Sequence, residues 1–127
     1  MIDYATFGVH DLATSAKFYD ATLGALGFKR AHEYPTTVGY AHPSGQTVWI
    51  LSPHDQKEAR AGNGSMVGFG ASTRAQVRDF HAAALANGGS CEGAPGLRED
   101  YGPNMYLAYV RDPVGNKMSA ICKATSE

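Results

Sequence analysis

The sequence predicts an α+β domain made of two tandem βαβββ modules that form a cleft. The main observation is an internal repeat: shifted by 62 residues, Tyr4–Gly27 lies on Met66–Gly89 with matching apolar and glycine positions. A second match, with an offset of 70 residues, places His42–Gln46 on Asp112–Asn116. A unit of about sixty residues is too long for a solenoid repeat and fits a duplicated half-domain. The 127 residues suffice for one such domain with a single core.

The first module, about residues 1–52, begins with a strand over 2–9 and a helix that Asp11 caps. Gly27 ends this helix, and three short strands follow near 28–33, 36–41 and 46–51, with turn residues between them. The buried face of the helix is predicted from apolar residues spaced three and four apart, namely Leu12, Ala16, Tyr19, Leu23 and Leu26.

A polar, glycine-bearing linker, about residues 53–65, leads to the second module, about residues 66–124. That module repeats the order, with a strand over 66–71 and a helix that opens on the capping-box sequence Thr73–Gln76. The buried face of this helix is expected to hold Val77, Phe80, Ala84 and Leu85, before Asn87-Gly88-Gly89 ends it. The remaining predictions are strands near 90–92, 105–110 and 117–122, and a long loop over 93–104.

Each helix covers one face of its sheet, so the other face must be buried by the twin module, a partner chain or a ligand. We therefore expect the functional site in the cleft between the modules, and a homodimer. The net charge of −1 argues against nucleic acid or an anionic membrane as partner, because both need a basic surface. Without a membrane-spanning stretch or a signal sequence, the expected location is cytoplasmic. In that compartment Cys91 and Cys122 are expected to be reduced and mostly buried.

The first module contains a series of short motifs, namely Asp11-Leu12, Ala16–Tyr19 and Leu23–Phe28. The second module contains three more, Phe80–Gly89, Gly93–Arg98 and Tyr106–Asn116. Together these segments resemble the vicinal oxygen chelate (VOC) superfamily, which includes glyoxalase I, extradiol dioxygenases, fosfomycin-resistance enzymes and bleomycin-binding proteins. Those of the second module look like a bacterial glyoxalase-like branch. The resemblance covers nearly the whole chain and implies the same paired-module fold.

The resemblance also implies four metal-ligand positions, one in the first and one in the last strand of each module, usually occupied by His, Glu or Gln. Carried onto this chain, those positions hold Tyr4, Trp49, Met66 and Ser119. A neutral phenol, an indole, a thioether and a hydroxyl are poor ligands for a catalytic divalent ion, which needs imidazole or carboxylate groups. None of the five histidines forms an HxH, HxxxH or HExxH pair. The sequence therefore predicts no metal and no other cofactor; the alternative is one divalent metal ion at ligands placed elsewhere.

With the metal ligands replaced, the same positions form an aromatic and thioether surface. Strand alternation adds Thr6, Gly8, Gly68 and Gly70 to this face, and these small residues leave room for a ligand. The competing interpretation is that the large side chains fill the old cavity. Arg98, with Asp100 and Tyr101 beside it, lies in the long loop and is a candidate to hold a carboxylate or phosphate, or else only to order that loop. Asp112 and Asn116 are better explained as caps of their turn.

Two classes of function follow. The first is a binding protein that holds a small aromatic or apolar molecule at Tyr4, Trp49, Met66, Ser119, Arg98 and Tyr101. The second is an enzyme, either a metal-dependent lyase or dioxygenase (lactoylglutathione lyase-like) or a metal-free isomerase or lyase that uses Tyr4 with His10 or Arg98. We favour binding, because no buried carboxylate or histidine is assured in the cleft to act as the general base.

Overall fold

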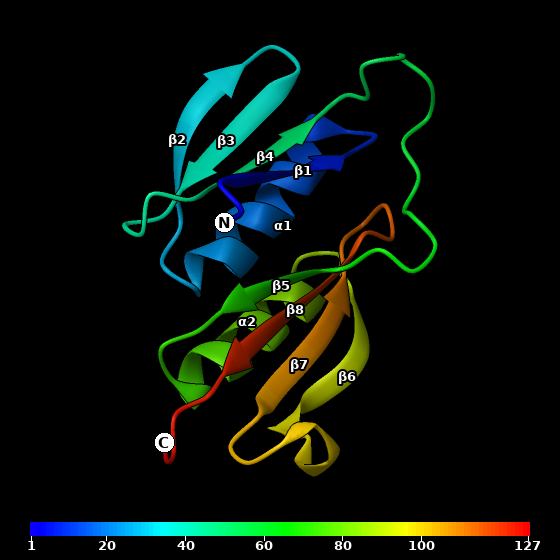
Figure 1. Ribbon diagram of the computed structural model, residues 1–127. Helices are drawn as coiled ribbons and strands as arrows, with labels where there is room; N and C mark the ends of the chain where they lie inside the picture. The colour runs from blue at the N-terminus through cyan, green and yellow to red at the C-terminus, as the bar shows by residue number, and fades with distance from the viewer.

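The computed structural model describes residues 1–127 and contains the two predicted βαβββ modules (Figure 1). The first module consists of β1 (Tyr4–Gly8), α1 (Leu12–Gly24), β2 (Lys29–Tyr34), β3 (Thr37–Ala41) and β4 (Thr47–Leu51). The second module consists of β5 (Val67–Gly70), α2 (Arg74–Ala86), β6 (Ser90–Leu97), the short 3₁₀ helix η1 (Glu99–Tyr101), β7 (Tyr106–Arg111) and β8 (Lys117–Cys122). Neither helix is long and apolar enough to cross a membrane.

The two modules have the same sheet topology, with strand orders β1-β4-β3-β2 and β5-β8-β7-β6. The first strand of each sheet runs parallel to the last, and all other pairs are antiparallel. In Figure 1 the sheets lie one above the other, each with its helix on one side, and the linker runs along the edge of the molecule. The edge strands β1 and β5 are thus the strands at which the two sheets approach each other.

Both helices begin at the predicted caps. The Asp11 carboxylate accepts hydrogen bonds from the amides of Ala13 and Thr14, at 3.1 and 3.4 Å. The Thr73 hydroxyl accepts from the Gln76 backbone amide at 3.1 Å, and the Gln76 side-chain oxygen accepts from the amide of Ser72, the residue before Thr73, at 2.7 Å. Because these side chains satisfy amides that have no partner within the helix, they fix where each helix starts.

A single core joins the modules, and 21 buried residues from both contribute to it. Most of the predicted helix-face residues are in it, including the fully buried Tyr19, Leu23, Val77 and Phe80. The helices α1 and α2 pack against each other, and Gly89 at the end of α2 gives the Phe18 ring room, since a Cβ there would lie 2.5 Å from that ring.

The turn between β7 and β8 also connects the modules. Asp112, only 3% exposed, accepts three hydrogen bonds at one carboxylate oxygen, from the amides of Val114, Gly115 and Asn116 at 2.8–2.9 Å. Its other oxygen accepts the buried Tyr19 hydroxyl at 2.6 Å, and the Asn116 side chain donates to the Gly8 carbonyl at 3.0 Å. Burial and the negative charge of Asp112 raise the pKa of Tyr19 well above its usual value, so Tyr19 stays protonated and donates this bond. The predicted capping role is confirmed, and the contact with Tyr19 adds a second role.

Three predictions about the second module were wrong. Strand β6 continues to Leu97 and η1 follows it, so most of the expected loop over 93–104 is regular structure. Leu85 is 46% exposed, because the helix face toward the core needs only Val77, Phe80 and Ala84. Both cysteines are free thiols, but only Cys122 is buried; Cys91 lies on the edge strand β6, exposed, with its sulfur 3.1 Å from His81 Nε2.

Candidate functional site

In each sheet, side chains alternate between a face covered by the helix and an opposite face, which we call the open face. On β4, Val48 and Ile50 are buried in the core, while Thr47, Trp49 and Leu51 are only partly buried on the open face. On β8, Met118, Ala120 and Cys122 form the core side, and Lys117, Ser119 and Ile121 the open face. The resemblance implied four ligand positions, Tyr4, Trp49, Met66 and Ser119. Counted along the alternation of β1, β4, β5 and β8, all four fall on the side of the open face. The surroundings of the four side chains differ.

Tyr4 and Met66 come together in a groove between the edge strands β1 and β5, with a volume of about 300 Å³. Both side chains are accessible, at 59% and 47% exposure, and form the outer walls of the groove. The buried rings of Phe28 and Phe69 meet edge to face at 5.8 Å between centroids and lie deeper in the groove. The apolar lining residues are Ile2, Tyr4, Ala5, Phe28, Val48, Met66, Val67 and Phe69. The groove is therefore an apolar site at the predicted junction of the modules.

Trp49 lies outside this groove and packs within its own sheet. Its indole covers the cross-strand neighbour Gly39 so closely that a Cβ on that glycine would fall 2.6 Å from the ring. The His32 ring stacks on the indole with 5.1 Å between centroids and 20° between planes. His32 was missed by sequence reasoning, because β2 carries an irregularity between Arg30 and His32 that breaks simple alternation. On this sheet the aromatic side chain occupies the position where the resemblance implies a ligand.

Ser119 is only 2% exposed and lies across from Tyr109, its partner in the register of β7 and β8. The Tyr109 ring is contacted by two cations, the Arg98 guanidinium and the Lys117 ammonium, each 5.6 Å from the ring centroid. Burial and the neighbouring Tyr101 raise the pKa of Tyr109, so its phenol is neutral at physiological pH. Tyr109 and Lys117 were not predicted as site residues; the repeat offset combined with strand register would have placed Tyr109 opposite Ser119.

Arg98 is held by its own strand. Its guanidinium donates to the carbonyls of Gly96 and Ala94, at 2.8 and 2.7 Å, beside the irregular register of β6. The bonds satisfy carbonyls that the irregular pairing of β6 with β7 leaves without a backbone partner. Arg98 therefore orders the chain around it, which was one of the two roles expected from the sequence. Tyr101 is 62% exposed in η1 and lies with Arg98 beside a shallow hollow at the far end of the second module. The structure thus separates Arg98 and Tyr101 from the groove that holds Tyr4 and Met66.

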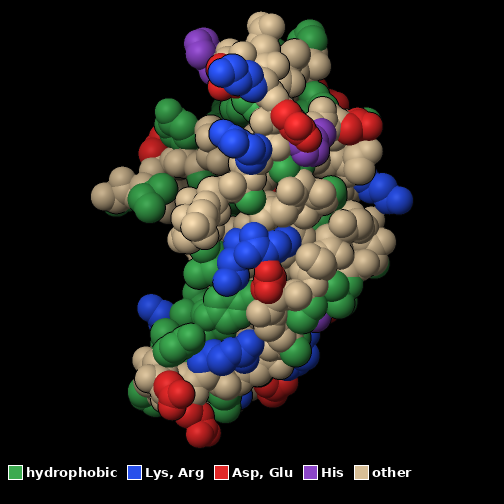
Figure 2. All heavy atoms as spheres, turned by 90° about the vertical axis from the view of Figure 1, so that its right-hand side faces the viewer, with side chains coloured by type: hydrophobic (Ala, Val, Ile, Leu, Met, Phe, Trp, Pro, Cys, Tyr) green, Lys and Arg blue, Asp and Glu red, His purple; other side chains and the backbone are tan.

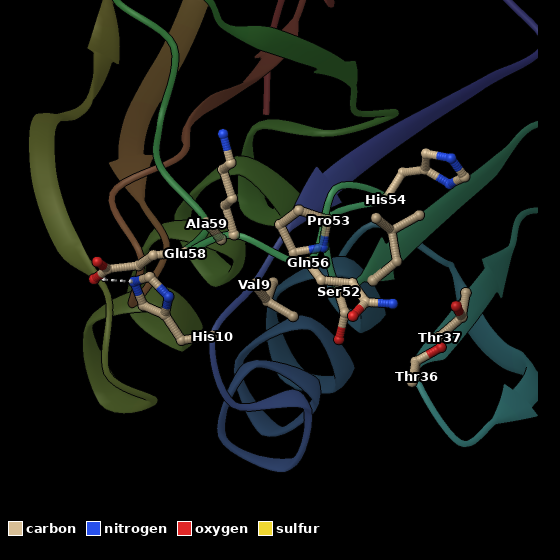
Figure 3. Close-up of a pocket in the computed structure, with 12 residues that line it drawn as sticks. Val9, His10, Thr36, Thr37, Ser52, Pro53, His54, Gln56, Glu58 and Ala59 are labelled. Carbon is tan, nitrogen blue, oxygen red and sulfur yellow. Dashed lines mark ion pairs between the residues drawn. The ribbon is translucent and has the colours of Figure 1, made fainter.

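A larger hollow, of about 830 Å³, lies between the linker and the ends of β3 and β4, and we call it the linker hollow (Figure 3). In the close-up, His10 and Glu58 point toward each other, with 3.9 Å between His10 Nε2 and the Glu58 carboxylate. Their side chains are 46% and 83% exposed, so water screens this pair. The lining is mostly polar and open, whereas small-molecule sites are mostly apolar with a few polar groups. We therefore place the candidate site in the groove.

The divalent metal ion implied by the resemblance does not fit the residues at its four positions. Tyr4 and Met66 offer a phenol and a thioether in the groove, the Trp49 indole is packed between Gly39 and His32, and Ser119 is buried beside Tyr109. Nowhere in the chain do three His, Cys, Asp or Glu side chains form a group that could hold a metal ion. Lewis-acid chemistry therefore has no donor set at these positions.

Comparison with known proteins places this geometry in a family. Residues 1–119 match the model of the Glyoxalase/Bleomycin resistance protein/Dioxygenase superfamily. A solved glyoxalase/bleomycin resistance protein from Albidiferax ferrireducens T118 is 43% identical, with a TM-score of 0.86, over 96% of this chain and 98% of that one. No curated protein matches the chain.

More distant solved structures share the fold. A glyoxalase-related enzyme from Fulvimarina pelagi is 20% identical with a TM-score of 0.75, over 96% of this chain and 87% of that one. Lactoylglutathione lyase from Agrobacterium tumefaciens is also 20% identical, with a TM-score of 0.68, over 96% and 92% of the two chains. The family model and the 43% identical relative together establish that the chain belongs to the glyoxalase/bleomycin resistance protein/dioxygenase superfamily.

Proposed function

We propose that this chain binds a small aromatic or apolar molecule in the groove between β1 and β5, without metal chemistry. The observation that carries the proposal is the groove itself: an apolar hollow of about 300 Å³ with Tyr4 and Met66 as its accessible walls. That volume is at the lower end of the range for small-molecule sites. A flexible thioether and a phenol ring that line one groove can adapt to a flat apolar ligand.

Binding is favoured over catalysis by the distribution of ionisable groups. Tyr4 lines the groove, whereas His10 lines the linker hollow and Arg98 lies on Tyr109. The partners that a metal-free isomerase or lyase would need are therefore held at other places, and proton transfer requires them within hydrogen-bond reach of the substrate. The only carboxylate lining the groove belongs to Asp3, which is exposed at the chain terminus.

The test measures the fluorescence of N-phenyl-1-naphthylamine, a neutral aromatic probe that brightens in apolar sites, during titration with the protein. Met66→Ala should weaken probe binding about fivefold, because it removes an apolar wall whose burial by the ligand contributes on the order of 1 kcal/mol. Leu85→Ala is the matched control, since Leu85 is equally exposed, at 46%, but lies on α2 away from the groove. Equal affinity for wild type and Met66→Ala, or no probe binding at all, would contradict the proposal.

A further inference from the structure

A second hollow adjoins the groove and has the opposite character. It has a volume of about 540 Å³ and is lined by residues 61–65 of the linker together with Met66, Arg111 and Lys117. The charged side chains in this lining are both basic, in contrast to the linker hollow, whose lining includes Glu58. We call it the basic hollow. Figure 2, which views the molecule from the linker side, shows basic side chains gathered near the middle of this face.

The backbone of the basic hollow can also receive an anion. None of the amides of residues 61–65 donates a hydrogen bond within the chain. Gly64, within this segment, takes a left-handed conformation, with φ of +87°. Consecutive free N–H groups in such a segment form concavities that bind anions.

Of the two cations, Lys117 is the one available to a ligand. Arg111 forms an ion pair with Glu92 through Nε and donates from Nη1 to the Gly115 carbonyl at 2.7 Å. The Lys117 ammonium has no carboxylate within ion-pair distance and lies over the Tyr109 ring instead. Arg111, and to a smaller extent Lys117, lower the pKa of Glu92, so Glu92 is ionised and neutralises one of these two positive charges. The hollow keeps a net positive charge.

Met66 lines both the groove and the basic hollow, so the two hollows adjoin at this side chain. We propose that the ligand is an aromatic acid, whose ring lies between Tyr4 and Met66 and whose anionic group is held by Lys117 and the free amides of residues 61–65. This inference rests on the proposed function, because the groove must first bind the ring. The anion needs no metal, since an ammonium and oriented amides supply the positive field that recognises a carboxylate or sulfonate.

The experiment compares two probes with the same ring system, N-phenyl-1-naphthylamine and 8-anilinonaphthalene-1-sulfonate, which differ by one sulfonate. Wild type should bind the sulfonate more tightly than the neutral probe, and this preference should fall as salt is raised. Lys117→Gln should weaken sulfonate binding about fivefold, a loss fitting an exposed charged contact, and leave the neutral probe unchanged. Lys123→Gln is the control, because Lys123 is an exposed lysine just beyond the end of β8 and outside the basic hollow. Circular dichroism melting of both variants verifies that they are folded.

The outcomes separate the two proposals. If the neutral probe binds and responds to Met66→Ala, but Lys117→Gln leaves sulfonate affinity unchanged, the proposed function stands and the anionic ligand is refuted. Equal affinity of wild type for the two probes refutes it as well. If neither probe binds wild type, both proposals fail together.

Discussion

The two modules place an aromatic residue opposite a small residue at equivalent cross-strand positions, but on opposite strands of the pair. On the open face of the first sheet, Gly39 of β3 pairs with Trp49 of β4; at the equivalent positions of the second sheet, 70 residues later, Tyr109 of β7 pairs with Ser119 of β8. Each pair therefore joins one aromatic residue and one small residue. The Trp49 ring lies against Gly39, its partner in the pair, whereas the Tyr109 ring lies against Gly93 of β6. Where the resemblance implies a metal ligand, the first module thus has the aromatic member of the pair and the second module has the small member.

The equivalent turns of the modules also differ. In the first module His42 accepts a hydrogen bond from the Ser44 amide and remains within its own module. In the second module Asp112 accepts three amides and also the Tyr19 hydroxyl of the other module. A carboxylate can accept at both oxygens, whereas a neutral imidazole accepts at one nitrogen only. Of the two equivalent turns, the second is the one whose side chain bonds to the other module.

The largest effect is therefore expected from Asp112→Ala. This change leaves the buried Tyr19 hydroxyl and the turn amides without their acceptor, at a cost of about 3 kcal/mol in the free energy of unfolding. His42→Ala is the matched change in the first module and should cost only about 1 kcal/mol, since its hydrogen bonds are exposed and its main packing contact is with the Phe28 ring. Urea denaturation of the two variants makes the measurement, and equal losses would show that the turns are equivalent after all.

An intermediate effect is expected from the small members of the two cross-strand pairs. Gly39→Ala places a methyl group where the Trp49 ring now lies, so the indole must move, at a cost of about 1–3 kcal/mol and with a shift in tryptophan emission. Ser119→Ala only removes a hydroxyl beside Tyr109 and should change stability by no more than about 0.5 kcal/mol. Unchanged emission in Gly39→Ala would mean that the indole does not lie on that glycine.

The smallest expected effect is that of added metal. Because phenol, indole, thioether and hydroxyl groups occupy the ligand positions, Zn²⁺, Mn²⁺ or Ni²⁺ should leave the melting temperature unchanged in differential scanning calorimetry. A ligand that binds only the native state stabilises it by mass action, so a rise of several degrees would reveal a site built from other residues. The metal-dependent lyase or dioxygenase would then become the better hypothesis.

The sequence was sufficient for the fold because the repeat, the helix caps at Asp11 and Thr73 and the apolar spacing all act locally. It was less informative about the second module, where glycines and a proline in residues 93–97 suggested a loop. They form the irregular strand β6 instead, since the Arg98 guanidinium satisfies the carbonyls that the ladder leaves free.

The candidate site was predictable only in part. Strand parity placed Tyr4, Trp49, Met66 and Ser119 on the open faces, but which of them share a hollow depends on how the sheets meet. The basic hollow depends on the path of the linker, which has no periodic pattern to read. Lys117 looked like an ordinary solvated lysine because its neighbours in sequence do not include Met66 or the linker residues that line the same space.

The bonds that Asp112 and Asn116 make to Tyr19 and Gly8 also bear on how the chain folds. A separate first module would lack the acceptor for the buried Tyr19 hydroxyl and the surface that covers Phe18. Neither repeat can therefore reach its final packing alone, and the duplicated halves should gain their structure in one cooperative transition. If the repeat arose from a gene for one half, two copies of that half would have had to associate to cover these groups.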